Sequence, residues 1–168
     1  PPGPRPGPAP LPRARAAAPR RGRGGRTGPA GDPTPRPRAR AAARRADAQG
    51  GWLVTAYPHG TPQPTPVWFR WDGADEVVVK SQPRTAKLRN VRANPRVAVH
   101  LNSTPSGGDV VVLTGTASVD DDGLSAAERA AYDAKYDDGI RGLGTTPDGF
   151  HDDYAVTLRV RLERLRGF

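Results

Sequence analysis

The first 46 residues restrict folding to the rest of the chain, because their composition cannot build a hydrophobic core. They are almost wholly Pro, Gly, Ala and Arg, with one leucine and no aromatic residue. Such a segment buries too little apolar surface to offset the entropy of ordering its backbone, about 1–2 kcal/mol per residue. We therefore expect a disordered tail over residues 1–46, with a short helix near its end at residues 35–49. Residues 47–168 are long enough to form one folded domain.

The basic charge of the chain belongs to this tail. The whole chain carries +9, but 12 arginines and one acidic residue give residues 1–46 a charge of +11 and leave −2 for the remainder. Three interpretations of the tail stay open: an extension without a function of its own, an arm that binds RNA or DNA, and a targeting segment. We do not expect the body to bind nucleic acid. No run of about 18 apolar residues indicates a membrane span, and the absence of cysteine fits the cytoplasm.

The body reads mainly as β-strands joined by short turns. The turn DGAD (Asp72–Asp75) predicts a hairpin, and Gly115 predicts a bulge or a close backbone approach within a long strand. Helices are expected at residues 83–93 and, after a capping box at Ser125–Glu128, as far as about residue 138. Apolar or alternating runs predict strands at residues 51–57, 64–71, 76–81, 96–101, 109–120 and 153–168. Six mostly antiparallel strands with two short helices indicate a mainly β protein built as a small barrel.

The sequence shows no pattern typical of a metal site or of a catalytic set of side chains. The three histidines, His59, His100 and His151, lack metal-ligand spacing. Walker loops, nucleophile elbows and dinucleotide fingerprints are also absent from the sequence. If the protein is an enzyme, we therefore expect a bound cofactor to provide the chemistry.

The segment SQPRTAKLRNVRANPRV (residues 81–97) is compatible with either a phosphate cradle or an ordinary solvated helix. Ser81 ends an expected strand and the helix begins near Thr85, so unpaired N–H groups and the positive end of the helix dipole meet there. Thr85 adds a hydroxyl group, Lys87 an ammonium group and Asn90 an amide. Spacing alone leaves both interpretations open.

Several motifs in the same order resemble the pyridoxamine 5′-phosphate oxidase-like split β-barrels. Within that group they resemble the probable F420-dependent enzymes of the flavin/deazaflavin oxidoreductase family. The motifs are WLVTAYPHGTPQPTPVWF, KSQPRTAKLRNVRANPRVAVHL, VVVLTGTASV, AYDAKY and RVRLERLRGF. The resemblance covers the body from about residue 52 onward. It implies a six-stranded antiparallel split barrel of the FMN-binding type.

The resemblance also implies a homodimer that binds its cofactor in a groove at the subunit interface. The residues implied to line the cofactor ring, largely through their backbone, are Thr65, Pro66, Val67 and Trp68. Those implied to bind its phosphate are Ser81, Thr85, Lys87 and Asn90. The position of Thr65 is typically an arginine in the flavin-using members, which favours coenzyme F420 over FMN.

We therefore expect an F420-dependent oxidoreductase that transfers a hydride between the reduced deazaflavin and a small unsaturated substrate. No catalytic protein side chain and no metal are expected, and loops 102–109 and 139–153 are expected to set the choice of substrate. Two alternatives stay open: an FMN-dependent oxidase or reductase of the same fold, and a non-catalytic binder of F420 or a tetrapyrrole.

Overall fold

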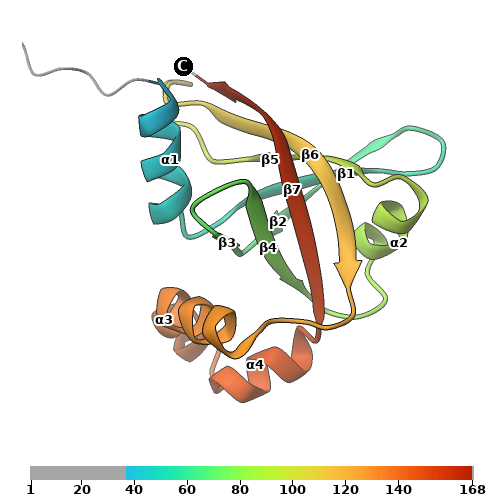
Figure 1. The fold of residues 1–168 in the computed structure, drawn as a ribbon, viewed down its shortest axis with the longest axis vertical. Coiled ribbons are helices and arrows are strands. Elements are labelled where there is room, and N and C mark those ends of the chain that lie inside the picture. The colour runs from blue at the N-terminus through green and yellow to red at the C-terminus, as the bar shows by residue number, and fades with distance from the viewer. Residues whose placement is uncertain (1–36, 168) are drawn as a thin grey trace, which may run out of the picture. The chain divides into compact units, whose positions relative to one another are not determined.

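The structure is a computed structural model that describes residues 37–167 (Figure 1). The disorder predicted for the tail before residue 37 lies outside these residues. The helices are α1 (Pro37–Asp47), α2 (Ala86–Ala93), α3 (Ala126–Gly142) and α4 (Pro147–Asp153). The strands are β1 (Gly51–Ala56), β2 (Pro62–Val67), β3 (Phe69–Trp71), β4 (Glu76–Ser81), β5 (Arg96–His100), β6 (Val111–Asp120) and β7 (Val156–Gly167).

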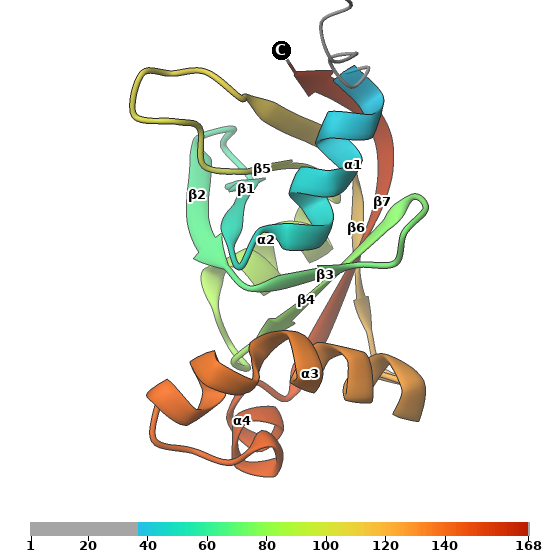
Figure 2. The same cartoon turned by 90° about the vertical axis from the view of Figure 1, so that its left-hand side faces the viewer.

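All seven strands form one antiparallel sheet in the order β2-β1-β5-β6-β7-β4-β3. The sheet curls into a half-barrel, with α3 and α4 beneath one end of it (Figures 1 and 2). Apolar side chains from most of the strands and from α2 form the main core, among them Leu53, Phe69, Val79, Val99, Leu113 and Leu158. The predicted class, a mainly β split barrel, is confirmed. Among the described helices, none is both long and apolar enough to cross a membrane.

The barrel has seven strands rather than six, because the strand predicted at residues 64–71 is interrupted at Trp68. β2 ends at Val67 and β3 begins at Phe69, and the two strands lie at opposite edges of the sheet. The backbone at the break is held by a helix instead of a neighbouring strand. The Phe69 N–H donates to the Tyr136 hydroxyl at 2.8 Å, and that hydroxyl donates to the Phe69 carbonyl at 2.5 Å. Tyr136 of α3 thus fixes the corner at which the chain crosses between the edges.

The predicted bulge at Gly115 is confirmed. The pairing between β6 and β7 shifts register between Thr114 and Gly115. An added Cβ atom at Gly115 would lie 1.9 Å from the Arg161 carbonyl oxygen, which no side chain can tolerate. Glycine therefore lets β7 approach the backbone of β6 closely enough to continue the ladder past the bulge.

The helical regions differ from expectation in two places. The short helix expected near the end of the tail is present as α1, which packs against β3 and β7. The loop expected at residues 139–153 contains four more residues of α3 and a separate helix, α4. The Thr146 side chain caps α4 by accepting the Gly149 N–H, and Pro147 occupies its first turn. Phe150 of α4 packs with Tyr132 and Tyr136 of α3 in a second apolar cluster.

Candidate functional site

A groove of about 410 Å³ lies where β1, the corner at Trp68, β4 and the start of α2 meet side chains of α3 and α4. Apolar and largely aromatic residues line much of it, namely Trp52, Pro66, Val67, Trp68, Phe150 and Tyr154. Polar side chains enter from β4, α2, α3 and the loop after β5, namely Lys80, Lys87, Tyr132 and Asn102. The groove therefore combines apolar, largely aromatic residues with two lysines.

Three neighbours hold the ring of Trp68 in place. The ring stacks on Tyr136 at 4.7 Å between centroids and 2° between planes, and on Phe150 at 5.5 Å. Gly139 of α3 lies against the indole edge, where an added Cβ atom would be only 2.8 Å from Trp68 Cη2. The side chain is thus packed before any ligand arrives.

The predicted phosphate-binding residues cluster at the junction of β4 and α2. Ser81 is buried, and its hydroxyl lies 3.1 Å from that of Thr85. Thr85 is the N-cap residue of α2, but its side chain makes no capping hydrogen bond. The residue before it, Arg84, has a φ of 63°, an unusual conformation for a residue other than glycine.

Lys87 is half-buried and lines the groove. Burial lowers the pKa of its ammonium group. No acidic side chain of residues 42–167 forms an ion pair with it. A buried cation without a protein counter-charge is a suitable partner for an anionic ligand.

Four predicted site residues are not part of the groove lining: Ser81 and Thr85 at the junction described above, and Asn90 and Thr65. Asn90 is buried on the inner side of α2, where Nδ2 donates to Thr55 Oγ1 at 3.0 Å and to Gln63 Oε1 at 2.8 Å. Both amide hydrogens are therefore engaged in joining α2 to β1 and β2. Thr65 lies on β2, opposite Leu53 of β1. The predicted residues that line the groove directly are Pro66, Val67, Trp68 and Lys87.

Lys80 and Tyr132 are among the lining residues that did not emerge from the sequence as site residues. Lys80 belongs to β4, in which residues 77–81 are all buried, so a lysine in such a strand was an available signal. Tyr132 is fully buried, and its hydroxyl has no hydrogen-bond partner of acceptable geometry in the described part of the chain. Tyr132 packs against α4 and also borders the groove.

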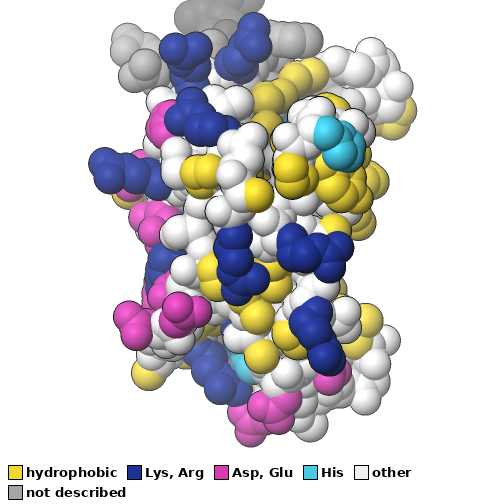
Figure 3. All heavy atoms as spheres, turned by 90° about the vertical axis from the view of Figure 1, so that its right-hand side faces the viewer, with side chains coloured by type: hydrophobic (Ala, Val, Ile, Leu, Met, Phe, Trp, Pro, Cys, Tyr) yellow, Lys and Arg dark blue, Asp and Glu magenta, His cyan; other side chains and the backbone are white. Residues whose placement is uncertain are grey.

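The histidines have local partners. His59 bonds to Thr61, His100 stacks on Trp52, and His151 lies 2.7 Å from Asp133. Within residues 42–167, no three histidine or acidic side chains are grouped as metal ligands. On the face of the molecule that carries α2, lysine and arginine side chains are scattered among apolar and neutral ones (Figure 3). That pattern differs from the continuous basic band typical of a nucleic-acid interface.

A curled antiparallel sheet with a groove beside its interrupted edge strand defines a split-barrel protein. Residues 38–167 match the pyridoxamine 5′-phosphate oxidase family, and the chain belongs to that family. No curated protein matches the sequence.

Solved structures with the same fold differ in what their names describe. One is an F420 reductase, with 24% sequence identity, 72% of this chain and 92% of that chain covered, and a TM-score of 0.55. A second is a putative pyridoxamine 5′-phosphate oxidase from Listeria innocua, with 21% identity, 74% and 91% covered, and a TM-score of 0.55. A third is HutZ, the heme storage protein from Vibrio cholerae, with 18% identity, 74% and 89% covered, and a TM-score of 0.57. At these identities the similarity defines the fold.

Proposed function

We propose that this protein is an oxidoreductase that binds coenzyme F420 in the groove beside Trp68. The observation that carries the proposal is the position of Lys87. It is a half-buried cation without an acidic partner among the described residues, and it lines the same groove as the apolar residues Pro66, Val67 and Trp68. A planar ring that carries a phosphate would match both features, because the ring would pack on these apolar residues and the phosphate would lie at the cationic end.

The residues of the groove would divide the work of binding. Lys87, with the hydroxyl groups of Ser81 and Thr85, would hold the phosphate at the N-terminal end of α2. The Ser81 hydroxyl donates to the Gln82 carbonyl in the free protein, so the Thr85 hydroxyl is the one that donates within the pair. Asn90 would support the site indirectly, by joining α2 to β1 and β2.

When bound, the reduced cofactor would supply a hydride, so the protein would have to hold and enclose the reactants rather than provide a nucleophile. Trp68 is held by Tyr136, Phe150 and Gly139, so it would present a rigid surface to the ring. Leu143, Phe150 and Tyr154 would cover the groove from the α3–α4 side and exclude water from it. Asn102 and Leu143 come from the loops expected to select the substrate.

The cofactor titration tests this proposal directly. Purified protein is titrated with F420 and separately with FMN, and tryptophan fluorescence reports occupancy because Trp68 and Trp52 line the groove. We expect F420 to bind more tightly than FMN. Lys87→Ala should weaken F420 binding by about 1.5–3 kcal/mol, the usual scale for a charge-assisted contact.

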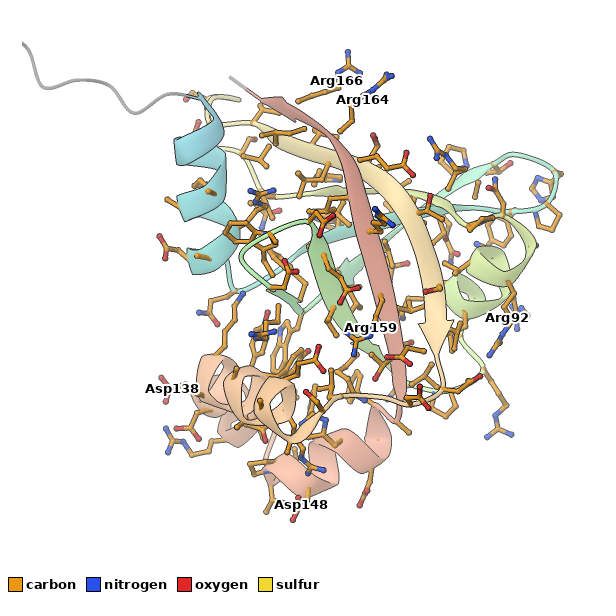
Figure 4. All side chains as sticks on the ribbon, viewed as in Figure 1. Arg92, Asp138, Asp148, Arg159, Arg164 and Arg166 are labelled. Atoms are coloured by element: carbon orange, nitrogen blue, oxygen red, sulfur yellow. The ribbon has the colours of Figure 1, made fainter. Side chains whose placement is uncertain are left out.

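The matched control is Arg92→Ala on the same helix, since Arg92 points away from the body (Figure 4). It should bind F420 as the unmodified protein does. Preference for FMN would move the protein to the flavin-dependent alternative. An unchanged affinity in Lys87→Ala would remove the phosphate assignment.

We further propose that two copies of the chain form the complete groove, as a homodimer. The single large hydrophobic side chain that is exposed among the described residues, Leu143, lines the groove at 56% exposure, so the groove reaches the surface on that side. Covering that side by a second copy would bury the rim and enclose the cofactor.

A further inference from the structure

Helix α1 is joined through Arg44 to the loop between β5 and β6. Arg44 Nη2 donates a hydrogen bond to the Asn102 carbonyl oxygen at 2.7 Å, at the start of the loop. Arg44 Nε lies 2.8 Å from Asp109 Oδ2, near the end of the loop, as an ion pair without hydrogen-bond alignment. The Asp109 side chain is only 15% exposed, so salt in the solvent screens this pair weakly. One side chain of α1 therefore holds both ends of the loop (Figures 1 and 2).

Hydrogen bonds within the loop hold its tip together. The Thr104 N–H donates to the Gly108 carbonyl oxygen at 2.9 Å, and the Gly107 N–H donates to the Thr104 carbonyl oxygen at 2.9 Å. The Gly108 N–H also donates to the Thr104 hydroxyl at 2.9 Å. A loop that is bonded to itself in this way can move as one unit about its two ends. The contacts at those ends, among them the two made by Arg44, therefore set its position.

The first residue of the loop, Asn102, belongs to the groove. Asn102 lines the groove, and its Oδ1 accepts a hydrogen bond from Trp52 Nε1 at 3.0 Å. Trp52 lines the groove too, and its ring stacks on His100 at 6.2 Å between centroids and 9° between planes. The backbone of Asn102 is thus bonded to Arg44 while its side chain is bonded to Trp52. A shift of the loop would move a polar and an aromatic residue of the groove together.

We propose that Arg44 is a positioning residue for the groove, and that α1 thereby controls how long a ligand stays bound there. While Arg44 holds the loop, Asn102 and Trp52 stay fixed beside the ligand. When α1 detaches, the loop can move and the ligand leaves more readily. The identity of the ligand rests on the function proposed above, whereas the contacts of Arg44 involve residues of this chain alone. The end of the arginine-rich tail thus takes part in binding.

Amide hydrogen exchange of the full chain tests the role of Arg44 without a ligand. Arg44→Met keeps a long side chain but removes both polar contacts. We expect the amides of residues 103–109 to exchange about fivefold faster or more in this variant. The matched control is Arg45→Met, because the Arg45 guanidinium lies 4.0 Å over the Trp71 ring of β3. It should leave those amides unchanged. Arg44→Lys keeps a positive charge for Asp109 and should restore part of the protection.

Release of F420 tests the consequence for binding. In stopped-flow displacement, F420 should leave Arg44→Met about tenfold faster than it leaves the unmodified protein or Arg45→Met, with little change in the association rate. FMN replaces F420 as the probe if the protein binds FMN instead. A merely structural role of Arg44 would raise exchange throughout the sheet and lower the melting temperature, without a selective effect on residues 103–109.

The two measurements separate failure of this proposal from failure of the proposed function. If the unmodified protein binds neither cofactor, the proposed function is wrong, and the exchange of residues 103–109 still decides whether Arg44 positions the loop. Equal exchange of these residues in Arg44→Met and Arg45→Met, or equal rates of cofactor release from the two variants, would overturn the proposal.

Discussion

At the scale of single residues, the groove depends on how closely side chains pack around Trp68. The indole ring stacks on Tyr136 and on Phe150, and Gly139 leaves room for its edge. Glycine within a helix costs up to about 1 kcal/mol relative to alanine. At Gly139 that cost is offset by an approach to Trp68 that no larger residue permits.

Gly139→Ala should therefore separate stability from binding. The new Cβ atom would lie 2.8 Å from Trp68 Cη2, so the ring has to move and the apolar lining of the groove changes shape. We expect altered tryptophan emission and F420 affinity reduced about tenfold, equivalent to 1.4 kcal/mol. Gly142→Ala is the matched control, because a Cβ atom there meets nothing within 4 Å. Gly142→Ala should leave tryptophan emission and F420 affinity unchanged. If the two variants behave alike, Gly139 is not needed to position the Trp68 ring.

Some of the residues that line the groove could be predicted from the sequence and others could not. Pro66, Val67, Trp68 and Lys87 were predicted and line it. Lys80 was not, although it directly follows the apolar run Val77–Val79, which was the available signal. The sequence also could not indicate that the amide of Asn90 is engaged with Thr55 and Gln63, since those contacts join segments 27 and 35 residues apart.

At the scale of elements, one arginine joins four of them. Arg159 of β7 forms ion pairs with Glu76 of β4 at 2.7 Å, Asp120 of β6 at 2.5 Å and Glu128 of α3 at 2.8 Å. It lies between the sheet and α3 (Figure 4). Glu128 also completes the capping box with Ser125. The first turn of α3 is therefore capped by its own residues and joined to β7 by the ion pair between Glu128 and Arg159.

This junction should make the protein sensitive to acid. Hydrogen bonds from the Arg159 guanidinium lower the pKa of Glu128 to about 2, from a usual value of 4.5. A folded-state pKa below the unfolded one adds stability that is complete above the unfolded pKa and is lost as the pH falls toward the folded pKa. The free energy of unfolding, measured with urea from about pH 6 to about pH 3, should decrease across this window.

Glu128→Gln removes this titrating group, so the variant should be less stable at neutral pH and lose less stability on acidification. The control is Asp138→Asn, because Asp138 is exposed and points away from α3 (Figure 4). Its pH dependence should match that of the unmodified protein. An equally steep loss in Glu128→Gln would show that other groups cause the acid sensitivity.

Local signals predicted most of the elements correctly. The DGAD hairpin, the Gly115 bulge and the Ser125 capping box each depend on a few adjacent residues, and each is present. The break at Trp68 was missed because it depends on the Tyr136 hydroxyl, 67 residues away. The helix α4 was missed because the glycines around it suggested a loop, whereas Thr146 and Pro147 start a helix there.

At the scale of the whole molecule, the open side of the groove points to assembly. If a second copy covers it, light scattering on the full chain should give about twice the 17.9 kDa of one chain. Leu143→Lys would place a charge on the apolar rim and should shift the mass toward one chain on dilution. Leu143 is on the surface of the single chain, so the variant should fold normally. A single-chain mass at every concentration would contradict the dimer.

The interruption at Trp68 couples the motions of the two edge strands of the sheet. β2 and β3 are the two free edges of the sheet, and one residue connects them. The two edge strands are thus joined by the backbone of Trp68 alone, so a displacement of either strand moves this residue and, through it, the other strand. A ligand bound against Trp68 would therefore restrain the motion of both edge strands, β2 and β3. Amide hydrogen exchange should slow together in β2 and β3 when the groove is filled, although these strands share no ladder.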